Sequence, residues 1–284
     1  MKAFEYKRPS SLREASVFLS EGGSDAHILN GGTDLVIRMR ERLTLPAVVV
    51  DIKGIPDLNR ITFDGDKGLH IGACVNLNVL GEHEDVVRHY PFLSRAALSV
   101  GSVQVRNRAT CVGNLCNASP LADTATPLLA LDAVVLVYGP EGEKEIPIRE
   151  FFVHVRKTCL KPGELVWGLR VPAPGTGLNG VFMKLSRRKE VDLSTVCCTV
   201  ARTESGWRAA YGAVAPTPVR LPKTEALLDG APLTPALVQE AAALAATEVS
   251  PIADTRSSRE YRVEMVQVLM KRSLQAILEK EGRR

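Results

Sequence analysis

The chain has 284 residues, of which 45% are hydrophobic and 24% are charged, with a formal net charge of +4. This length accommodates two domains, and the composition is that of a globular protein, which excludes a wholly disordered chain. The charge is too small and too scattered to indicate nucleic-acid binding. No stretch of about 18 apolar residues suggests a membrane span, and the N-terminus lacks the apolar core of a signal peptide, so we expect a cytoplasmic protein.

The first 53 residues predict a small α/β unit. A strand is followed by a helix, at whose start Ser11 and Glu14 have the spacing of a capping box. The short β-branched stretches AHILN (26–30) and AVVVDI (47–52) predict two strands. Between them lies NGGTD (30–34), which we interpret as a glycine turn between two strand-like segments.

Residues 54–177 predict a second part with more strands and short helices. Three stretches have strand composition, at 68–75, 133–139 and 164–171. Residues 76–102 predict two helices interrupted at Pro91, and 124–132 predicts a short helix. The segment 104–123 is polar and contains glycine, and it is too long for a plain turn. The Pro- and Gly-rich stretch 171–177 predicts a domain boundary.

The remaining residues predict a smaller α+β domain, with strands first and helices after them. Three β-rich stretches, at 180–188, 193–203 and 207–214, predict an antiparallel meander. A helix follows with Thr234 as N-cap and Pro235 in its first turn. The last predicted helix starts at a second capping box, formed by Ser257 and Glu260.

Two polar loops that contain glycine, 30–34 and 106–123, carry the candidate chemistry. Neither the phosphate loop G-x-x-x-x-G-K-S/T nor the dinucleotide signature G-x-G-x-x-G is present, which excludes those two sites. Glycine still allows consecutive N–H groups to approach an anion, and Thr33 and Thr110 add hydroxyl donors. Asp34 suits a ribose or ribityl hydroxyl, or the N–H groups of its own loop. Taken alone, NGGTD is more simply explained as a turn that ends a strand.

The second loop ends in Asp123, at the start of a predicted helix. A carboxylate there suits the helix dipole, so a helix cap is one interpretation and an acceptor for the hydroxyls of a polyol chain is the other. Asn114, Asn117 and Ser119 add short polar side chains, which suit a ligand rich in oxygen.

The cysteines and histidines do not predict a metal site. Cys111 and Cys116 have the spacing that begins a plant-type ferredoxin motif, but Ser119 stands where the third cysteine belongs. The five histidines show no H-x-H or H-x-x-x-H pair. We therefore expect no metal bound by this chain alone, and scattered cysteines that pack as small buried groups.

Together these residues resemble the FAD-binding, or medium, subunit of molybdenum hydroxylases, the xanthine dehydrogenase and aerobic carbon monoxide dehydrogenase family. The shared motifs are P-x-S-L-x-E-A, A-G-G-T-D-L, I-G-A, the long segment ending N-A-S-P-x-A-D, F-x-K-x-x-R-R-x-x-D and D-x-R-x-S-x-x-Y-R. They fall, almost from end to end of the chain, at 9–15, 30–35, 71–73, 104–123, 182–192 and 254–262.

Two positions depart from the family pattern. Asn30 stands where the family usually has Ala, and its amide could reach a phosphate or cap the turn. Val112 stands where the family usually has Gly. Because a β-branched residue resists positive φ, either the backbone is extended there or the loop is shifted.

The resemblance implies an α+β fold in two domains. The first, 1–177, is a FAD-binding domain of the vanillyl-alcohol-oxidase/p-cresol-methylhydroxylase type, with subdomains of about 1–53 and 54–177. The second, 178–284, is a smaller α+β domain with a three-stranded antiparallel sheet and helices. Non-covalent FAD would place its pyrophosphate on the backbone of 31–34 and 110–114.

The resemblance also implies the residues around FAD. Asp123 would bind ribityl or ribose hydroxyls, and the strand with Lys184 and the turn at Asp192 would approach the flavin ring. A cation near the pyrimidine side is chemically sensible because it stabilises negative charge on the flavin. The expected FAD-binding residues are Leu29, Asn30, Gly31, Gly32, Thr33, Asp34, Thr110, Gly113, Asn114, Ser119, Asp123, Lys184 and Asp192.

The implied function is electron transfer from the 2Fe–2S clusters of a partner subunit through FAD to NAD+, a quinone or oxygen. The implied partners are a small iron–sulfur subunit and a large subunit with the molybdenum cofactor, assembled as a dimer of heterotrimers. The chain needs no catalytic acid–base residues and would lack hydroxylase activity alone. Two alternatives remain: a self-sufficient FAD oxidase, disfavoured by the small second domain, and a scaffold without flavin, suggested only by Val112.

Overall fold

A parallel three-stranded sheet forms the first subdomain of the computed structural model, which describes residues 1–281. The central strand β3 pairs in parallel with β1 and with β2. The elements in chain order are β1 (Glu5–Lys7), α1 (Leu12–Gly22), the 3-10 turn Gly23–Asp25, β2 (Ala26–Leu29), α2 (Leu35–Arg40), β3 (Val48–Asp51) and the 3-10 turn Ile52–Gly54. The predicted α/β unit is therefore present, with both strands where expected.

Two local predictions in this subdomain need correction. The glycine turn leads into the short helix α2 and not directly toward a strand, because Leu35 and Met39 fall one helical turn apart and Met39 is buried. The capping box of α1 forms with a shift of one residue. Ser11 accepts from the N–H of Glu14 at 3.2 Å, but the Glu14 carboxylate accepts from the N–H of Ser10 at 2.7 Å.

An antiparallel five-stranded sheet in the order β4-β5-β10-β6-β7 forms the second subdomain. Its strands are β4 (Ile61–Asp64), β5 (Gly68–Gly72), β6 (Val134–Gly139), β7 (Gly142–Pro147) and β10 (Leu165–Val171), with the separate hairpin β8 (Phe152–His154) and β9 (Lys157–Thr158). The three predicted strands are the three central ones. The two edge strands carry few buried residues, which is why their composition gave no signal.

Short helices cover this sheet. They are α3 (Leu77–Glu82), α4 (Glu84–His89), α5 (Pro91–Leu98), α6 (Val103–Arg106), α7 (Cys111–Cys116), α8 (Ala125–Ala130) and α9 (Ile148–Phe151). The prediction of two helices interrupted at Pro91 is incomplete, because His83 has extended dihedrals (φ −64°, ψ 129°) and separates α3 from α4. The predicted short helix at 124–132 is α8.

The C-terminal sheet is an antiparallel meander, as predicted, with one additional short strand. It runs in the order β11 (Asn179–Leu185), β12 (Val196–Thr203), β13 (Gly206–Gly212) and β14 (Val219–Arg220). The helices are α10 (Pro222–Asp229), α11 (Pro235–Thr247) and α12 (Arg259–Glu281). Thr234 caps α11 as predicted. The α12 cap is Ser258 and not Ser257, since the Ser258 hydroxyl accepts from the N–H of Tyr261 at 3.1 Å.

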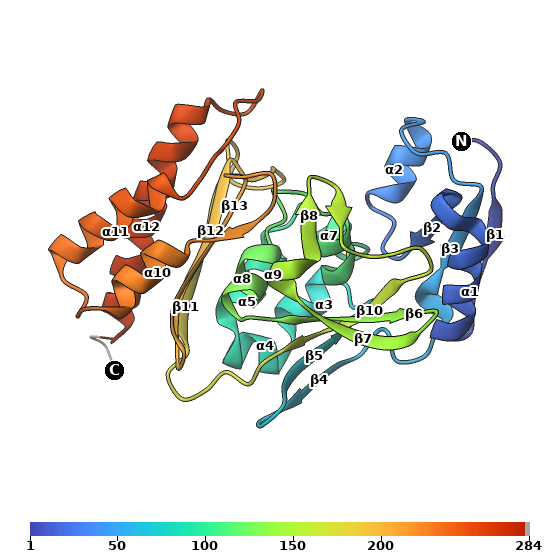
Figure 1. Ribbon diagram of the computed structural model, residues 1–284, viewed down its shortest axis with the longest axis horizontal. Coiled ribbons are helices and arrows are strands. Elements are labelled where there is room, and N and C mark those ends of the chain that lie inside the picture. Colours follow the sequence, from blue (N-terminus) through green and yellow to red (C-terminus); the bar gives the residue numbers. More distant parts are fainter. Residues whose placement is uncertain (282–284) are drawn as a thin grey trace.

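Both faces of the C-terminal sheet are buried. Alternate residues point to opposite faces: Phe182 and Cys197 belong to the core of the first domain, while Val181 and Cys198 belong to the core under α10–α12. Helices α5 and α8 contact one face, and α10 and α12 contact the other. Figure 1 shows this sheet edge-on between the two sets of helices, with the N-terminal sheet at the far end of the molecule.

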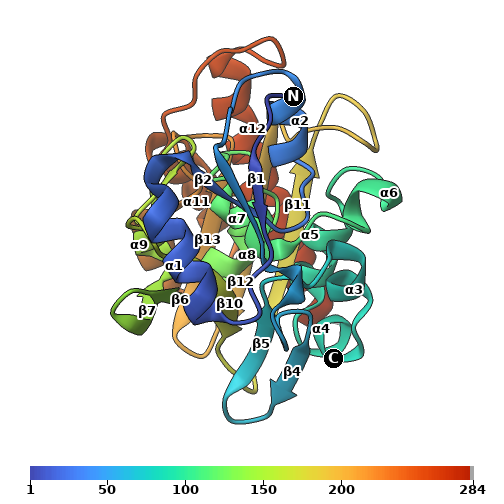
Figure 2. The same ribbon diagram turned by 90° about the vertical axis from the view of Figure 1, so that its right-hand side faces the viewer.

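The N-terminal subdomain forms one face of the molecule when it is viewed end-on, with α1 and α2 on either side of β1 (Figure 2). Within residues 1–281, every helix is either too short or too polar to span a lipid bilayer.

Candidate functional site

The two loops singled out from the sequence are in direct contact, and Gly31 shows how closely they approach. A Cβ on Gly31 would lie 2.2 Å from the carbonyl oxygen of Arg108, so only glycine fits at this position. Gly32 has a different requirement, because its φ of +78° lies in the left-handed region. Leu29, at the end of β2, packs against the Gly32 position. Glycine at position 31 therefore permits the close approach of the two loops, and glycine at position 32 permits the chain to reverse direction.

Asn30 bridges the two subdomains beneath this contact. It is 9% exposed, and its amide donates to the carbonyl oxygen of Ala73 at 2.6 Å and to the hydroxyl oxygen of Thr110 at 3.0 Å. Both N–H donors are thus used inside the fold, so the amide does not serve a phosphate and does not simply cap its own turn. Within residues 1–281 the buried Asn30 Oδ1 has no hydrogen-bond partner. Such an atom favours a bound donor.

The second loop contains a helix that the sequence did not predict, α7, which begins directly after Thr110. The Thr110 hydroxyl oxygen accepts from the N–H of Gly113 at 2.9 Å, as an N-cap does. Since this oxygen also accepts from Asn30, the hydroxyl hydrogen remains available for an acceptor. Val112 lies within α7 and is 3% exposed, with no positive φ. The backbone there is helical, so the expectation of an extended backbone at Val112 was wrong.

A second bridge joins the loops at the surface. The side chain of Asn117 donates to Asp34 Oδ1 at 3.2 Å and accepts from the guanidinium of Arg156 at 2.6 Å. Asp34 is exposed and stands at the N-cap of α2 without a side-chain capping bond, and Thr33 is half-buried beside it. Arg156, in the turn of the β8–β9 hairpin, was missed because it is distant in sequence from both loops.

Asn114 and Ser119 use their side chains within the second loop. Asn114 Oδ1 accepts from the Thr124 hydroxyl at 2.7 Å. The Ser119 hydroxyl oxygen accepts from the N–H of Leu121 at 3.2 Å. Both residues therefore fix the path of the chain between α7 and α8.

Asp123 and Lys184, predicted to lie near one ligand, form a buried ion pair with each other. Asp123 is 5% exposed; its Oδ2 lies 2.6 Å from Lys184 Nζ, and its Oδ1 accepts from the Ser194 hydroxyl at 2.5 Å. Lys184 also donates to the carbonyl oxygen of Ser99 at 3.0 Å. Burial raises the pKa of Asp123, and the Lys184 ammonium opposes that rise. Because Thr124 occupies the N-cap of α8 without a side-chain bond, Asp123 is not a helix cap.

Asp192 lies apart from this pair and closes its own loop. Its carboxylate accepts from the N–H groups of Arg188 at 3.0 Å and Leu193 at 2.9 Å, and these bonds lower its pKa. The loop between β11 and β12 is thereby held folded back on itself.

Lys53 is the cation that the sequence reasoning missed, because no lysine is near NGGTD along the chain. Its ammonium donates to the carbonyl oxygen of Asn30 at 3.3 Å and pairs with Asp51 Oδ1 at 2.6 Å, and the Tyr6 hydroxyl holds the other Asp51 oxygen at 2.5 Å. Since β2 and β3 are parallel neighbours, their C-terminal ends meet at one edge of the sheet. Parallel pairing of these two strands was therefore the feature that could have indicated a residue just after β3 close to NGGTD.

The cysteines do not form a ligand cluster in the described part of the chain. Among residues 1–281 no group of three or more His, Cys, Asp or Glu side chains could hold a metal ion. Burial raises the pKa of Cys111 and of Cys116 to about 12, so both thiols stay protonated at neutral pH.

Comparisons with known proteins cover both domains. A family model described as the FAD binding domain in molybdopterin dehydrogenase matches residues 2–174, and one described as the CO dehydrogenase flavoprotein C-terminal domain matches 181–277. The Escherichia coli O157:H7 xanthine dehydrogenase FAD-binding subunit is 32% identical over 94% of this chain and 93% of its own length. The carbon monoxide dehydrogenase medium chain of Hydrogenophaga pseudoflava is 34% identical over 96% of both chains.

A solved structure gives the same answer for the fold. Carbon monoxide dehydrogenase from Hydrogenophaga pseudoflava, in a form that lacks the Mo-pyranopterin moiety of its cofactor, superposes with a TM-score of 0.93 over 98% of both chains at 34% identity. The resemblance, the α+β fold class and the expectation of an oxidoreductase subunit are confirmed. The chain belongs to the family of FAD-binding medium subunits of the molybdenum hydroxylases.

Proposed function

We propose that the chain holds FAD non-covalently where loops 30–34 and 110–114 meet, and transfers electrons from the 2Fe–2S clusters of a partner to an acceptor. The proposal rests on the junction of Asn30, Gly31 and Thr110. The two loops approach too closely there for any side chain at Gly31, and within residues 1–281 the buried Asn30 Oδ1 has no hydrogen-bond partner. Bound FAD supplies redox chemistry that no side chain of this chain offers. NAD+, a quinone or oxygen is the acceptor.

The glycine loop is assigned the pyrophosphate. Gly31 and Gly32 have no side chains that would keep an anion away from their N–H groups. The hydroxyls of Thr33 and Thr110 are additional donors to phosphate oxygens. Lys53 places a cation 3.3 Å from the Asn30 carbonyl and supports an anion on this loop. Asn30 Oδ1 needs a donor, so a ligand hydroxyl or amino group suits it and a phosphate does not.

The other end of the ligand is assigned to Lys184. Its ammonium uses two N–H donors, on Asp123 and on the carbonyl oxygen of Ser99, which leaves the third for the pyrimidine side of the flavin. A fixed cation there stabilises negative charge on the ring, and Asp123 keeps it in place. Asp123 retains free lone pairs for a ribityl or ribose hydroxyl. Leu29, Asp34, Gly113, Asn114, Ser119 and Asp192 complete the proposed lining.

The proposed partners are a small iron–sulfur subunit and a large subunit that carries the molybdenum cofactor, in a dimer of heterotrimers in the cytoplasm. Support comes from relatives that are named as a medium chain or as a FAD-binding subunit, which are parts of larger enzymes. The chain itself needs no catalytic acid or base in this role.

Titrating the purified chain with FAD tests the cofactor proposal. We expect a yellow protein with flavin absorbance bands, quenching of free-FAD fluorescence at one FAD per chain, and no oxidation of small alcohols or amines. Failure to take up FAD at micromolar concentration contradicts the proposal. Turnover of a small alcohol by the chain alone indicates a self-sufficient oxidase instead.

Gentle purification of a tagged chain from its native host tests the partners. Recovery of an iron–sulfur subunit and a molybdenum subunit in equal amounts is expected. Recovery of the bare chain alone under conditions of low salt contradicts the proposed assembly.

A further inference from the structure

A pocket lies in the C-terminal domain, apart from the proposed FAD site. It has a volume of about 330 Å³ and is formed by the end of β11 and the residues after it, the residue before β12, the turn before α12 and the first turn of α12. Its lining consists of two arginines, three serines, one threonine, one tyrosine and one leucine, with no acidic side chain. A pocket lined by cations and hydroxyl groups, without carboxylates, is suited to an anion.

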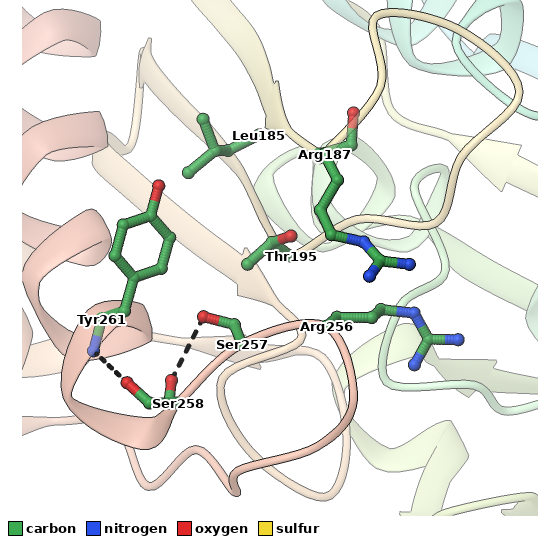
Figure 3. Close-up of a pocket in the computed structure, with 8 residues that line it drawn as sticks. Leu185, Arg187, Thr195, Arg256, Ser257, Ser258 and Tyr261 are labelled. Atoms are coloured by element: carbon green, nitrogen blue, oxygen red, sulfur yellow. Dashed lines mark hydrogen bonds between the residues drawn. The ribbon is translucent and has the colours of Figure 1, made fainter.

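The two arginines are Arg187, which follows β11, and Arg256, in the turn before α12. Figure 3 shows their guanidinium groups one above the other on the same side of the pocket, both directed away from Tyr261. Arg187 is exposed, and its one protein hydrogen bond within residues 1–281 is a long one, 3.5 Å to the carbonyl oxygen of Thr255. Most of its five N–H donors are therefore free.

Arg256 is positioned by a carboxylate that does not neutralise the pocket. Asp254 Oδ2 lies 3.1 Å from the Arg256 guanidinium, but Oδ1 of the same carboxylate pairs with the buried Arg262 at 2.7 Å. Partial burial alone would raise the pKa of Asp254. The hydrogen bonds from the N–H of Arg256 and from Arg262 outweigh this and hold the pKa at about 2. The one negative charge of Asp254 is thus shared by two guanidinium groups. Arg187 adds a third guanidinium group, and the Asp192 carboxylate, whose pKa Arg187 helps to lower, lies outside the pocket lining.

The pocket and the Lys184–Asp123 pair use opposite faces of the same strand ends. Lys184 and Leu185 are consecutive in β11, and Ser194 and Thr195 are consecutive just before β12. Lys184 and Ser194 point to Asp123, whereas Leu185 and Thr195 line the pocket. The pocket therefore shares no lining residue with the proposed FAD site.

We propose that this pocket binds the phosphate group of a small molecule through Arg187 and Arg256. Guanidinium groups match a phosphate in charge and in fork geometry, and the serine and threonine hydroxyls add neutral donors. Figure 3 shows Leu185 and Tyr261 on the side of the pocket opposite the guanidinium groups. A ligand with a flat apolar group, such as a nucleotide, would contact both sides, and inorganic phosphate would use the arginines alone.

Calorimetry on the full chain saturated with FAD tests the site, with inorganic phosphate, AMP and acetate as probes at constant ionic strength. We expect millimolar or tighter binding of phosphate and AMP. Arg187→Gln and the double variant Arg187→Gln/Arg256→Gln should weaken it, the double variant by about tenfold or more, because it removes both charged donors to the phosphate. Arg259→Gln removes a nearby charge outside the lining and should change nothing.

Three results would overturn the proposal: no phosphate binding at millimolar concentration, equal binding of acetate and phosphate, or unchanged affinity in the double variant. The Arg187→Gln variant is expected to fold normally, because within residues 1–281 that side chain makes only the long hydrogen bond to Thr255. A loss of binding in this variant therefore reports on the pocket and not on misfolding. AMP that binds more tightly than phosphate, with the advantage lost in Tyr261→Ala, identifies a nucleotide as the source, whereas equal affinities identify free phosphate. Since the pocket shares no lining residue with the proposed FAD site, loss of phosphate binding in these variants with FAD binding retained separates this proposal from the proposed function.

Discussion

The two ends of the proposed FAD site are built by different physical means. At the loop junction, backbone and neutral groups make the contacts: Gly31 lies against the Arg108 carbonyl, and Asn30 is bonded to Thr110. At the other end a buried charge pair, Lys184 with Asp123, connects the two domains. The first end depends on the missing Cβ of Gly31 and on a neutral hydrogen bond, and the second depends on two charged side chains that compensate one another. They should therefore fail in different ways when changed.

The ion-pair end should show the largest effect. Lys184→Met leaves the Asp123 carboxylate buried with neutral partners, the Ser194 hydroxyl and the Cys197 thiol. We expect this to lower the free energy of unfolding by about 3–5 kcal/mol at pH 7. The raised pKa of Asp123 then lets it take up a proton in the folded state before the unfolded chain does. The deficit should consequently shrink as the pH is lowered from 7 toward 5, in denaturant titrations followed by circular dichroism.

The matched control is the double variant Lys184→Met/Asp123→Leu. Replacing a buried pair by apolar groups is often close to neutral, so the double variant should recover much of the lost stability. If the loss of stability in the double variant equals the sum of the losses in the two single variants, the pair is not coupled and the comparison is contradicted.

The loop end should show an intermediate effect. Gly31→Ala places a Cβ 2.2 Å from the Arg108 carbonyl oxygen, and because backbone must move, we expect a loss of about 1–3 kcal/mol together with weaker FAD binding. Gly177→Ala, where a Cβ meets nothing within 4 Å, is the control. Thermal melts and FAD fluorescence titrations measure both quantities. If the Gly31→Ala variant binds FAD as the natural chain does, the proposed reason for a glycine there is removed.

Thr110→Val should give the smallest loss of stability, because the new side chain keeps the shape but removes the cap of α7 and the acceptor for Asn30. The expected loss is about 1 kcal/mol in the free chain. If the hydroxyl also donates to the ligand, the free energy of FAD binding should be reduced by more than the free energy of unfolding. Equal stability of the variant and the natural chain in denaturant titrations would show that α7 does not depend on this cap.

The difference between the two ends also explains how much the sequence revealed. Gly31, Gly32, Thr110 and Asp123 were singled out because glycine and short polar residues gather in two loops, and such clusters are visible along the chain. The contacts between the loops, and the pairing of Asp123 with Lys184, join residues 61 positions apart or more and depend on how the domains pack. Sequence spacing carries no direct signal for them.

Secondary structure was likewise predicted where the composition along the chain carries the information. Strands buried on one or both faces, such as β5, β12 and β13, were predicted because their composition reflects burial. The helices α2 and α7 were missed because each is short and follows directly on a polar loop that contains glycine, whereas the equally short α8 is almost wholly apolar and was predicted. The edge strands β4 and β7 were missed because solvent leaves their composition free. Lys53 was missed for another reason, since it reaches the glycine loop from the 3-10 turn that follows the neighbouring strand β3.

The C-terminal sheet has a consequence for how this protein comes apart. Its strands contribute Phe182, Cys197 and Ala210 to one core and Val181, Cys198 and Ala209 to the other, so neither core is complete without it. A chain cut at the boundary would expose an apolar sheet face or an uncovered layer of helices. The two domains are therefore expected to melt in a single cooperative transition, and neither can be exchanged in evolution without redesigning the sheet that they share.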